Sequence, residues 1–214
     1  MEMTVYGRAT SSNVQALLWG MEELGLSYER LDYGEVYGGL DSAEFRAMTP
    51  HGCIPVLTIG DVALFETGAI LRHLAGEHGD EAFWPSEPLK RAQVDMWAEW
   101  AKYEVAARFT GPVFWRHTRT APERRNSALV TRNLVTLESE LEKADARLQA
   151  ARFLCGDALT LADIQLGHVL YRYFDIDIAR RDFPALRTYY DGLSARPAYQ
   201  RTIMVSYDAL RDTF

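Results

Sequence analysis

The chain has 214 residues, of which 48% are hydrophobic and 25% charged, a balance that predicts a globular protein of one large domain or two small ones. Its net charge of −7 argues against nucleic acid as the main partner, because phosphate binding requires a basic face. The N-terminus MEMTVYGRAT lacks the regions of a secretory signal, and no apolar run reaches the roughly 18 residues of a membrane span, so we expect no membrane partner.

The two cysteines, Cys53 and Cys155, form neither a CxxC pair nor a cluster with other metal-ligating residues. This pattern favours a reducing compartment, so we expect a cytoplasmic protein without a metal site or a disulfide framework. The locally basic segment RHTRTAPERR, residues 116–125, is expected to be a solvated loop.

Strand and helix signals alternate over residues 1–79. MTVYG predicts a strand, and the apolar residues of NVQALLWGMEEL recur every three or four positions, which predicts a helix ending at Gly25. SYERLDY predicts a second strand, followed by an irregular segment with at most two helical turns. IPVLTIGDVALF predicts a hairpin with Gly60-Asp61 at its turn, and TGAILRHLAGEHG predicts a helix. This order of elements indicates a mixed sheet with helices on its faces.

Beyond residues 80–88, which read as a proline-containing linker, strand signals nearly vanish. Residues 89–109 predict a long helix that Gly111-Pro112 breaks, and residues 130–148 show a clear amphipathic helical repeat. LADIQLGHVLYRYF is apolar almost all round and predicts a buried central helix, and FPALRTYYDGLSARPAY supplies one more. Residues 89–214 are therefore expected to form an all-helical C-terminal domain.

Two short motifs border the predicted hairpin. A cis Ile54-Pro55 bond would expose the amide and carbonyl of Ile54 to an extended peptide, whereas a trans proline opening a strand is the simpler alternative. Glu66 and Thr67 stand where a helix begins. The free N–H groups of that helix suit a carboxylate and Glu66 suits an ammonium, so the pair can hold the end of an α-amino acid. The alternative is a helix capped by Thr67 beside a solvated glutamate.

A third motif, LTLADIQL, opens the apolar helix of the second half. Thr160 and Asp163 follow the S/T-x-x-D pattern of a capping box, and Leu159 and Ile164 are placed for a hydrophobic staple. Because these contacts stabilise a helix start, we expect a folding element without a catalytic role.

The order of these features resembles the cytosolic glutathione transferase family over essentially the whole chain. The resemblance is carried by the strand-helix-strand start, Pro50 and Ile54-Pro55 before a hairpin, Glu66-Thr67 opening a helix, the linker and the helical half. It implies an α/β thioredoxin-like N-terminal domain, residues 1–79, followed by an all-α C-terminal domain. It favours the bacterial, serine- or asparagine-type branch of the family.

The resemblance also implies a binding site for glutathione as an extended peptide. Its residues would be His51, Cys53, Ile54, Pro55, Glu66 and Thr67. The peptide would run along Ile54 and Pro55, with its γ-glutamyl end on Glu66 and Thr67. Cys53 stands where the family often has a lysine or arginine facing the glycyl carboxylate, and His51 is the candidate replacement.

In this family the loop after the first strand places a catalytic group beside the glutathione sulfur. A free thiol has a pKa of about 8.5, and a hydrogen-bond donor to sulfur favours the reactive thiolate. Ser11 is the first candidate for this donor, Asn13 the second and Tyr6 the third. Ser11 and Ser12 also suit the alternative role of helix N-cap. The absence of cysteine from residues 8–19 argues against members that form mixed disulfides with glutathione.

The electrophile pocket implied by the resemblance lies between the two domains, against the first-strand loop and the first long helix of the second domain. Its candidates are Arg8, Met96, Trp100 and Tyr103, although aromatic residues at helical spacing are more often core. His168, on the apolar helix, is expected to be a satisfied core histidine.

The resemblance implies a homodimeric glutathione transferase of the detoxification type. It would use glutathione as co-substrate and direct its thiol at small hydrophobic electrophiles. Two alternatives stay open. The same thiolate would attack sulfur in a glutathione-dependent disulfide reductase, and the fold would serve partner binding alone in a non-catalytic protein, which Cys53 in place of a basic residue favours.

Overall fold

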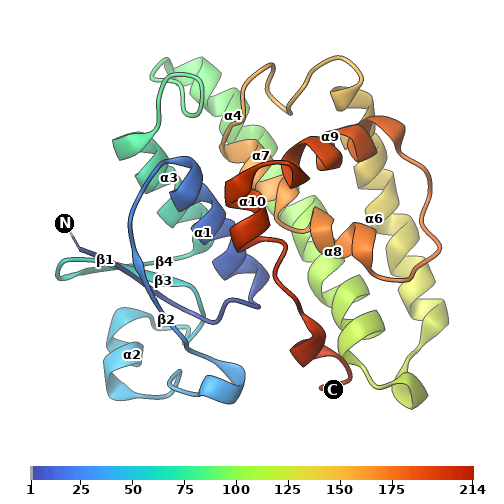
Figure 1. Ribbon diagram of the computed structural model, residues 1–214, viewed down its shortest axis with the longest axis horizontal. Helices are drawn as coiled ribbons and strands as arrows, with labels where there is room; N and C mark the ends of the chain where they lie inside the picture. Colours follow the sequence, from blue (N-terminus) through green and yellow to red (C-terminus); the bar gives the residue numbers. More distant parts are fainter. Residues whose placement is uncertain (1) are drawn as a thin grey trace.

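A four-stranded mixed sheet organises the N-terminal domain of the computed structural model, which describes residues 2–214 (Figure 1). Its strands are β1 (Met3–Tyr6), β2 (Glu29–Leu31), β3 (Val56–Ile59) and β4 (Val62–Phe65), in the order β2-β1-β3-β4. β1 pairs parallel with β2 and antiparallel with β3, and β3 pairs antiparallel with β4. The predicted mixed sheet is confirmed.

Three helices complete this domain: α1 (Ser12–Glu23), α2 (Ala43–Met48) and α3 (Thr67–His78). α1 and α3 lie between the sheet and the C-terminal helices, and α2 lies on the other side of the sheet (Figure 1). α1 is buried on nearly every face because it packs against α3 on one side and α7 and α10 on the other. Gly25 has a φ of 68° just past the end of α1, a conformation that favours glycine and stops the helix as predicted.

The C-terminal domain begins with one long helical rod. α4 (Pro88–Trp100) continues through a π-helical segment (Ala101–Ala106) and α5 (Ala107–Phe109) into a second π-helical segment (Thr110–Arg119). The predicted break at Gly111-Pro112 is therefore wrong. Pro112 lies in the second π-helical segment, whose wider turn keeps the rod continuous although the proline donates no backbone hydrogen bond.

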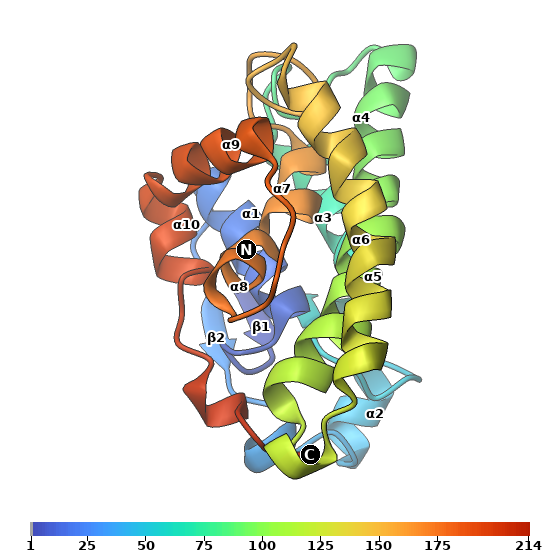
Figure 2. The same cartoon turned by 90° about the vertical axis from the view of Figure 1, so that its right-hand side faces the viewer.

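The remaining helices pack around this rod. They are α6 (Ser127–Leu148), α7 (Leu161–Gly167), α8 (Leu170–Asp175), α9 (Pro184–Ser194) and α10 (Pro197–Thr202). Figure 2 shows α6 running alongside the rod, and the two pack against each other over that length. The predicted single helix over residues 161–174 is interrupted at His168 and Val169. Pro197 lies past the end of α9 and opens α10.

The two domains share one hydrophobic core. Trp19 of α1 is fully buried and packs edge-on against Tyr199 of α10, with ring centroids 4.9 Å apart. Gly167 at the end of α7 allows this approach, because a Cβ there would lie 2.8 Å from the Trp19 ring. The core therefore fixes the first helix of the sheet domain against the helical domain, and both contribute to any site between them.

The predicted capping box is present at the start of α7. Asp163 is fully buried, and its carboxylate accepts hydrogen bonds from the Thr160 amide and hydroxyl, both at 2.8 Å. It also accepts from the Leu154 amide and the Tyr189 hydroxyl, both at 3.0 Å. Burial raises the pKa of Asp163, and these donors oppose that shift.

Candidate active site

A groove of about 220 Å³ lies where the segment before β3 meets the turn between β4 and α3. Its lining includes all six residues predicted to bind glutathione: His51, Cys53, Ile54, Pro55, Glu66 and Thr67. The Ile54-Pro55 bond, for which the sequence left both isomers open, is cis. Residues predicted as a group from two separate motifs thus meet in one concave surface.

Glu66 and Thr67 present the start of α3 to this groove. Glu66 has a φ of 68°, a conformation that is uncommon outside glycine and that often occurs at functional sites. The N-cap is Glu66, and Thr67 is already the first helical residue, so the prediction of a threonine cap is wrong. The Glu66 side chain makes no capping hydrogen bond, which leaves the first N–H groups of α3 for a ligand carboxylate.

His51 and Cys53 occupy the other part of the groove. The His51 ring lies edge-on to Phe65, with ring centroids 5.7 Å apart. The Cys53 thiol is exposed and donates to the carbonyl of His51 at 3.5 Å. The groove therefore offers an imidazole and a thiol where the family often has a long basic side chain.

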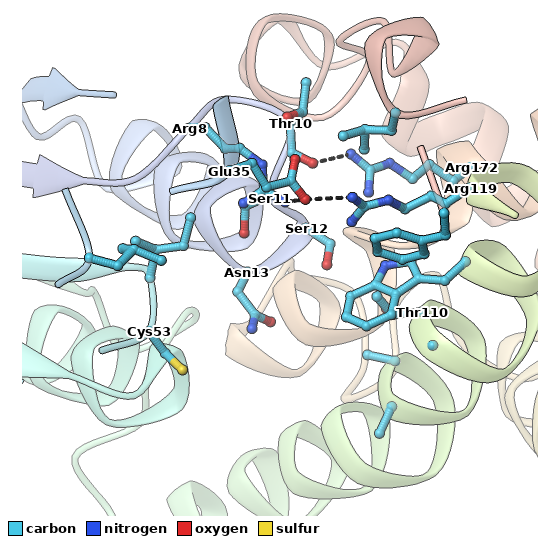
Figure 3. Close-up of a pocket in the computed structure, with 18 of the residues that line it drawn as sticks. Arg8, Thr10, Ser11, Ser12, Asn13, Glu35, Cys53, Thr110, Arg119 and Arg172 are labelled. Carbon is cyan, nitrogen blue, oxygen red and sulfur yellow. Dashed lines mark hydrogen bonds and ion pairs between the residues drawn. The ribbon is translucent and has the colours of Figure 1, made fainter. Parts of the chain in front are cut away.

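A larger cavity of about 570 Å³ adjoins the groove and lies between the two domains (Figure 3). Asn13, Cys53 and Ile54 line both spaces, so a ligand in the groove meets the cavity at these residues. Ser11, Ser12 and Arg8 also line the cavity from the loop between β1 and α1. The helical domain closes the opposite wall with residues from the rod and from α8.

Of the three candidate thiol activators, Ser11 and Asn13 line the cavity. Ser11 is the N-cap of α1, and its Oγ accepts a long hydrogen bond of 3.5 Å from the Val14 amide. Its hydroxyl hydrogen stays available for donation, so capping and catalysis do not compete. Tyr6 packs edge-on against Tyr33, with ring centroids 5.3 Å apart, and is not among the described residues that line either space.

Lys102 of the helical rod reaches the site, which the sequence reasoning missed. Its Nζ donates to Oδ1 of Asn13 at 2.6 Å, across the boundary between the domains. This contact fixes the orientation of the Asn13 amide. Its Nδ2 atom, with two hydrogens, then points the other way and can donate to a ligand. Burial lowers the pKa of Lys102, whereas the negative charges of Glu66 and Glu99 act to raise it.

The rod presents a different face to the cavity from the one predicted. The lining residues Lys102, Ala106 and Thr110 follow one another at intervals of four. Within the described chain, Met96, Trp100 and Tyr103 do not line the cavity, which corrects their assignment beside Arg8. Met96 and Tyr103 are 58% and 65% exposed, and Trp100 donates to Glu140 of α6 at 3.0 Å. The sequence shows that this segment is helical but not the angle at which the helix meets the first domain.

A cluster of arginines forms the wall opposite the groove. Arg8 and Arg119 both pair with Glu35, at 2.8 and 2.6 Å, and Arg172 of α8 donates to the carbonyl of Thr10 at 2.8 Å (Figure 3). Arg119 is buried and belongs to the rod, so the prediction of a solvated loop over residues 116–125 is wrong at this end.

His168 is buried as predicted. Burial lowers its pKa to about 3, and the charge of Lys102 acts in the same direction. Neither ring nitrogen makes a well-aligned hydrogen bond within residues 2–214, although backbone contacts with Ile164 and Gln165 oppose the lowering of the pKa. The ring is therefore a neutral group packed in the core behind the site.

Two general features of the described chain bear on the kind of site. No three histidine, cysteine or acidic side chains of residues 2–214 gather in a way that could hold a metal ion. None of the helices within this range has the length and apolar character needed to cross a membrane.

Comparisons with known proteins place the chain among glutathione transferases. Residues 1–76 match the family model "Glutathione S-transferase, N-terminal domain", and residues 106–197 match "Glutathione S-transferase, C-terminal domain". The chain is 31% identical over 205 residues to glutathione S-transferase GstB of Escherichia coli (strain K12), covering 95% of this chain and 98% of that protein. It is 33% identical over 199 residues to glutathione S-transferase 4 of Zea mays, covering 91% and 88%.

A solved structure supports the same conclusion. The theta class glutathione S-transferase of Xanthomonas axonopodis pv. citri with glutathione bound superposes with a TM-score of 0.90 at 36% identity, covering 95% of this chain and 98% of that one. These matches confirm the predicted fold, a thioredoxin-like N-terminal domain followed by a helical C-terminal domain. The chain therefore belongs to the glutathione S-transferase family.

Proposed function

We propose that this protein is a glutathione transferase that binds glutathione in the groove and attacks electrophiles held in the adjoining cavity. The observation that carries the proposal is that Asn13, Cys53 and Ile54 line both spaces. A peptide lying along Ile54 and Pro55 would bring its central residue, a cysteine in glutathione, to this junction. The structural neighbour with glutathione bound supports the choice of ligand.

The two ends of the peptide would be held by opposite ends of the groove. The α-carboxylate of the γ-glutamyl group would accept from the uncapped N–H groups of α3, and its ammonium would pair with Glu66. The glycyl carboxylate would face His51, which stands in for the missing basic residue beside Cys53. The thiol would then lie beside the first turn of α1.

Ser11 and Asn13 would activate the thiol there. A hydrogen bond donated to sulfur stabilises the thiolate, and charge-assisted bonds of this kind contribute about 1.5–3 kcal/mol each. One such bond lowers the thiol pKa by about one to two units, since each unit corresponds to about 1.4 kcal/mol. Lys102 would add a positive charge and hold Oδ1 of Asn13, so that its N–H groups face the sulfur.

The reaction is a nucleophilic substitution. The thiol proton passes to water, the thiolate sulfur forms a bond to an electrophilic carbon, and the leaving group departs with the electron pair of its broken bond. Catalysis consists of positioning and of stabilising the thiolate before the attack.

We further propose that the enzyme acts as a homodimer with domains at residues 1–79 and 89–214. An exposed apolar stripe on the rod supports this, because Leu89, Met96 and Tyr103 recur every seven residues. A spacing of seven keeps side chains on one helix face, and such a face commonly meets a partner.

The test is to measure glutathione binding by calorimetry together with conjugation of 1-chloro-2,4-dinitrobenzene. The proposal expects both binding and conjugation. Binding with turnover of a small disulfide but no conjugation would favour a disulfide reductase instead. No binding at millimolar glutathione would leave a non-catalytic protein and overturn the proposal.

A further inference from the structure

The cavity that faces the proposed thiol carries an excess of positive charge. Four cationic side chains line it: Arg8, Lys102, Arg119 and Arg172. Among the described residues of the lining, Glu35 is the single acidic side chain, and it already serves both Arg8 and Arg119. Binding of an uncharged hydrophobic electrophile would not require this excess of positive charge.

Arg172 is the most constrained of these cations. It is 3% exposed, and no carboxylate within residues 2–214 forms an ion pair with it. It donates to the neutral carbonyl of Thr10, and its guanidinium lies 4.9 Å from the centre of the Phe114 ring. Burial lowers its pKa to about 10, and Arg8 and Arg119 act in the same direction. Desolvating a guanidinium without a counter-charge is costly, so an anion that enters here relieves that cost.

A purely structural role does not account for the cluster. The Glu35 pairs and the Thr10 bond do link the two domains, but Nε of Arg8 and Nε of Arg172 are buried without any hydrogen-bond partner in the described chain. These Nε atoms are themselves shielded from the cavity, but both guanidinium groups line it, and their planar forks suit an acceptor with several oxygens. A carboxylate offers that geometry, and among the described residues of the lining only Glu35 supplies one.

The rest of the cavity is apolar. This part is lined by Trp115, Phe214, Leu40 and Ile54. The Arg119 guanidinium stacks over Phe214 at 4.0 Å from the ring centre. This wall suits a flat hydrophobic body whose charged end reaches the arginines. The volume of about 570 Å³ suits a small aromatic molecule.

We propose that the second substrate is an amphiphilic electrophile, with an apolar body and a carboxylate or similar anionic group that binds Arg172, Arg119 and Arg8. The inference rests on the proposed function and narrows it. In the reaction with an acidic aryl chloride, the glutathione sulfur bonds to the ring carbon, the C–Cl bond breaks, chloride leaves, and the thiol proton goes to water. The carboxylate takes no part in the bond changes and only positions the ring.

The experiment compares 4-chloro-3,5-dinitrobenzoate with its neutral amide, 4-chloro-3,5-dinitrobenzamide. Each kcat/KM is divided by the uncatalysed rate constant with glutathione, which removes the difference in intrinsic reactivity. The proposal expects the carboxylate to exceed the amide by about 10-fold or more, the effect of one charge-assisted contact. Equal values, or a preference for the amide, overturn it.

Variants assign the preference to the arginines. Arg172→Met and Arg119→Met are expected to lower the ratio of carboxylate to amide by about 5- to 10-fold, and Arg119→Lys is expected to retain more of it than Arg119→Met. Arg201→Met is the matched control, because Arg201 is exposed and pairs with Glu22 away from the cavity. A ratio that no cavity variant changes overturns the assignment, as does an effect confined to the KM for glutathione, which would mean that the arginines bind the tripeptide.

Binding to the unaltered protein keeps the test decisive if a variant fails to fold. The inhibitors 3,5-dinitrobenzoate and 3,5-dinitrobenzamide lack a leaving group, and the acid is expected to inhibit about 10-fold more strongly. If the neutral aryl chloride is conjugated and the acid holds no advantage in rate or inhibition, the inference fails while the transferase function stands. If neither aryl chloride is conjugated, the transferase function itself fails.

Discussion

The link between Asn13 and Lys102 joins the two domains at the point where the thiol would react. The short contact of 2.6 Å orients the amide of Asn13 and brings a half-buried positive charge to the first turn of α1. Ser11 has no such partner from the second domain and depends on its place as N-cap. Thiol activation is thus expected to require both domains, although the proposed donors belong to the first.

Replacing Lys102 tests this dependence. Lys102→Met removes a positive charge near the sulfur and frees Oδ1 of Asn13, so the thiolate becomes less favourable. We expect the bound thiol pKa to rise by about one unit and kcat/KM at pH 7 to fall about 10-fold. The pH profile of kcat/KM measures the shift. Lys102→Arg is the control and should keep the profile nearer to the unaltered one, and a profile that neither variant moves would contradict the role of Lys102.

His168 makes stability depend on pH. Its pKa of about 3 lies below the ordinary 6.5, so below pH 6.5 the unfolded chain binds a proton that the folded chain does not. The contribution of His168 to the free energy of unfolding is therefore fully present above pH 6.5 and is lost as the pH falls toward 3. Between pH 7 and pH 5 the expected loss from this group is about 2 kcal/mol.

Urea unfolding of His168→Leu at both pH values checks this contribution. In the variant, the difference in unfolding free energy between pH 7 and pH 5 should be smaller by the His168 contribution. Leu166→Val, a buried neighbour, serves as control because it should lower stability equally at both. An unchanged difference in His168→Leu would refute the assignment.

At the scale of elements, the start of α7 depends on the side chain of Asp163, which binds several surrounding groups. Asp163 accepts four hydrogen bonds, two of them from backbone amides of Leu154 and Thr160. Asp163→Ala leaves buried donors unpaired and is expected to cost about 3–5 kcal/mol of unfolding free energy, whereas Thr160→Ala removes mainly the cap and should cost about 1 kcal/mol.

Chemical denaturation compares these variants with Thr136→Ala, an exposed threonine on α6 that should change stability by less than about 0.5 kcal/mol. A cost for Asp163→Ala no larger than that for Thr160→Ala would show that the additional bonds contribute little.

The helices also show which structural features can be predicted from local sequence patterns. The capping box at Thr160 and the stop at Gly25 depend on residues close in sequence, and both were predictable. The course of the rod through Pro112 was not, because a wider π-helical turn accommodates a proline that donates no backbone hydrogen bond. Apolar periodicity reports a helix but carries no signal for this change of hydrogen bonding.

At the scale of the molecule, the same distinction separates the two halves of the site. The residues of the proposed glutathione groove were predicted as a group because they border one hairpin, whose geometry follows from local sequence. The second cavity forms between domains, so its lining depends on how the rod is rotated. Lys102, Arg119 and Arg172 were missed for this reason, and Met96 and Tyr103 were assigned to the wrong face.

The outward face of the rod leads to a prediction about assembly. Leu89 and Met96 are exposed on α4 and continue with Tyr103 as one apolar stripe. Met96→Glu places a charge in the proposed dimer interface and is expected to shift the protein toward monomer in light scattering. Val135→Glu, at another exposed apolar position on α6, is the control and should not change the mass. A monomeric unaltered protein, or a Met96→Glu dimer, would exclude this interface.

The most direct test of the account is the titration of bound glutathione, followed by thiolate absorption at about 240 nm. S-methylglutathione provides the blank, since it binds without an ionisable thiol. The account predicts a midpoint at least about one unit below the free value of about 8.5 and a return toward that value in Ser11→Ala or Asn13→Ala. A midpoint at or above 8.5, or one that neither substitution moves, would contradict thiol activation at the first turn of α1.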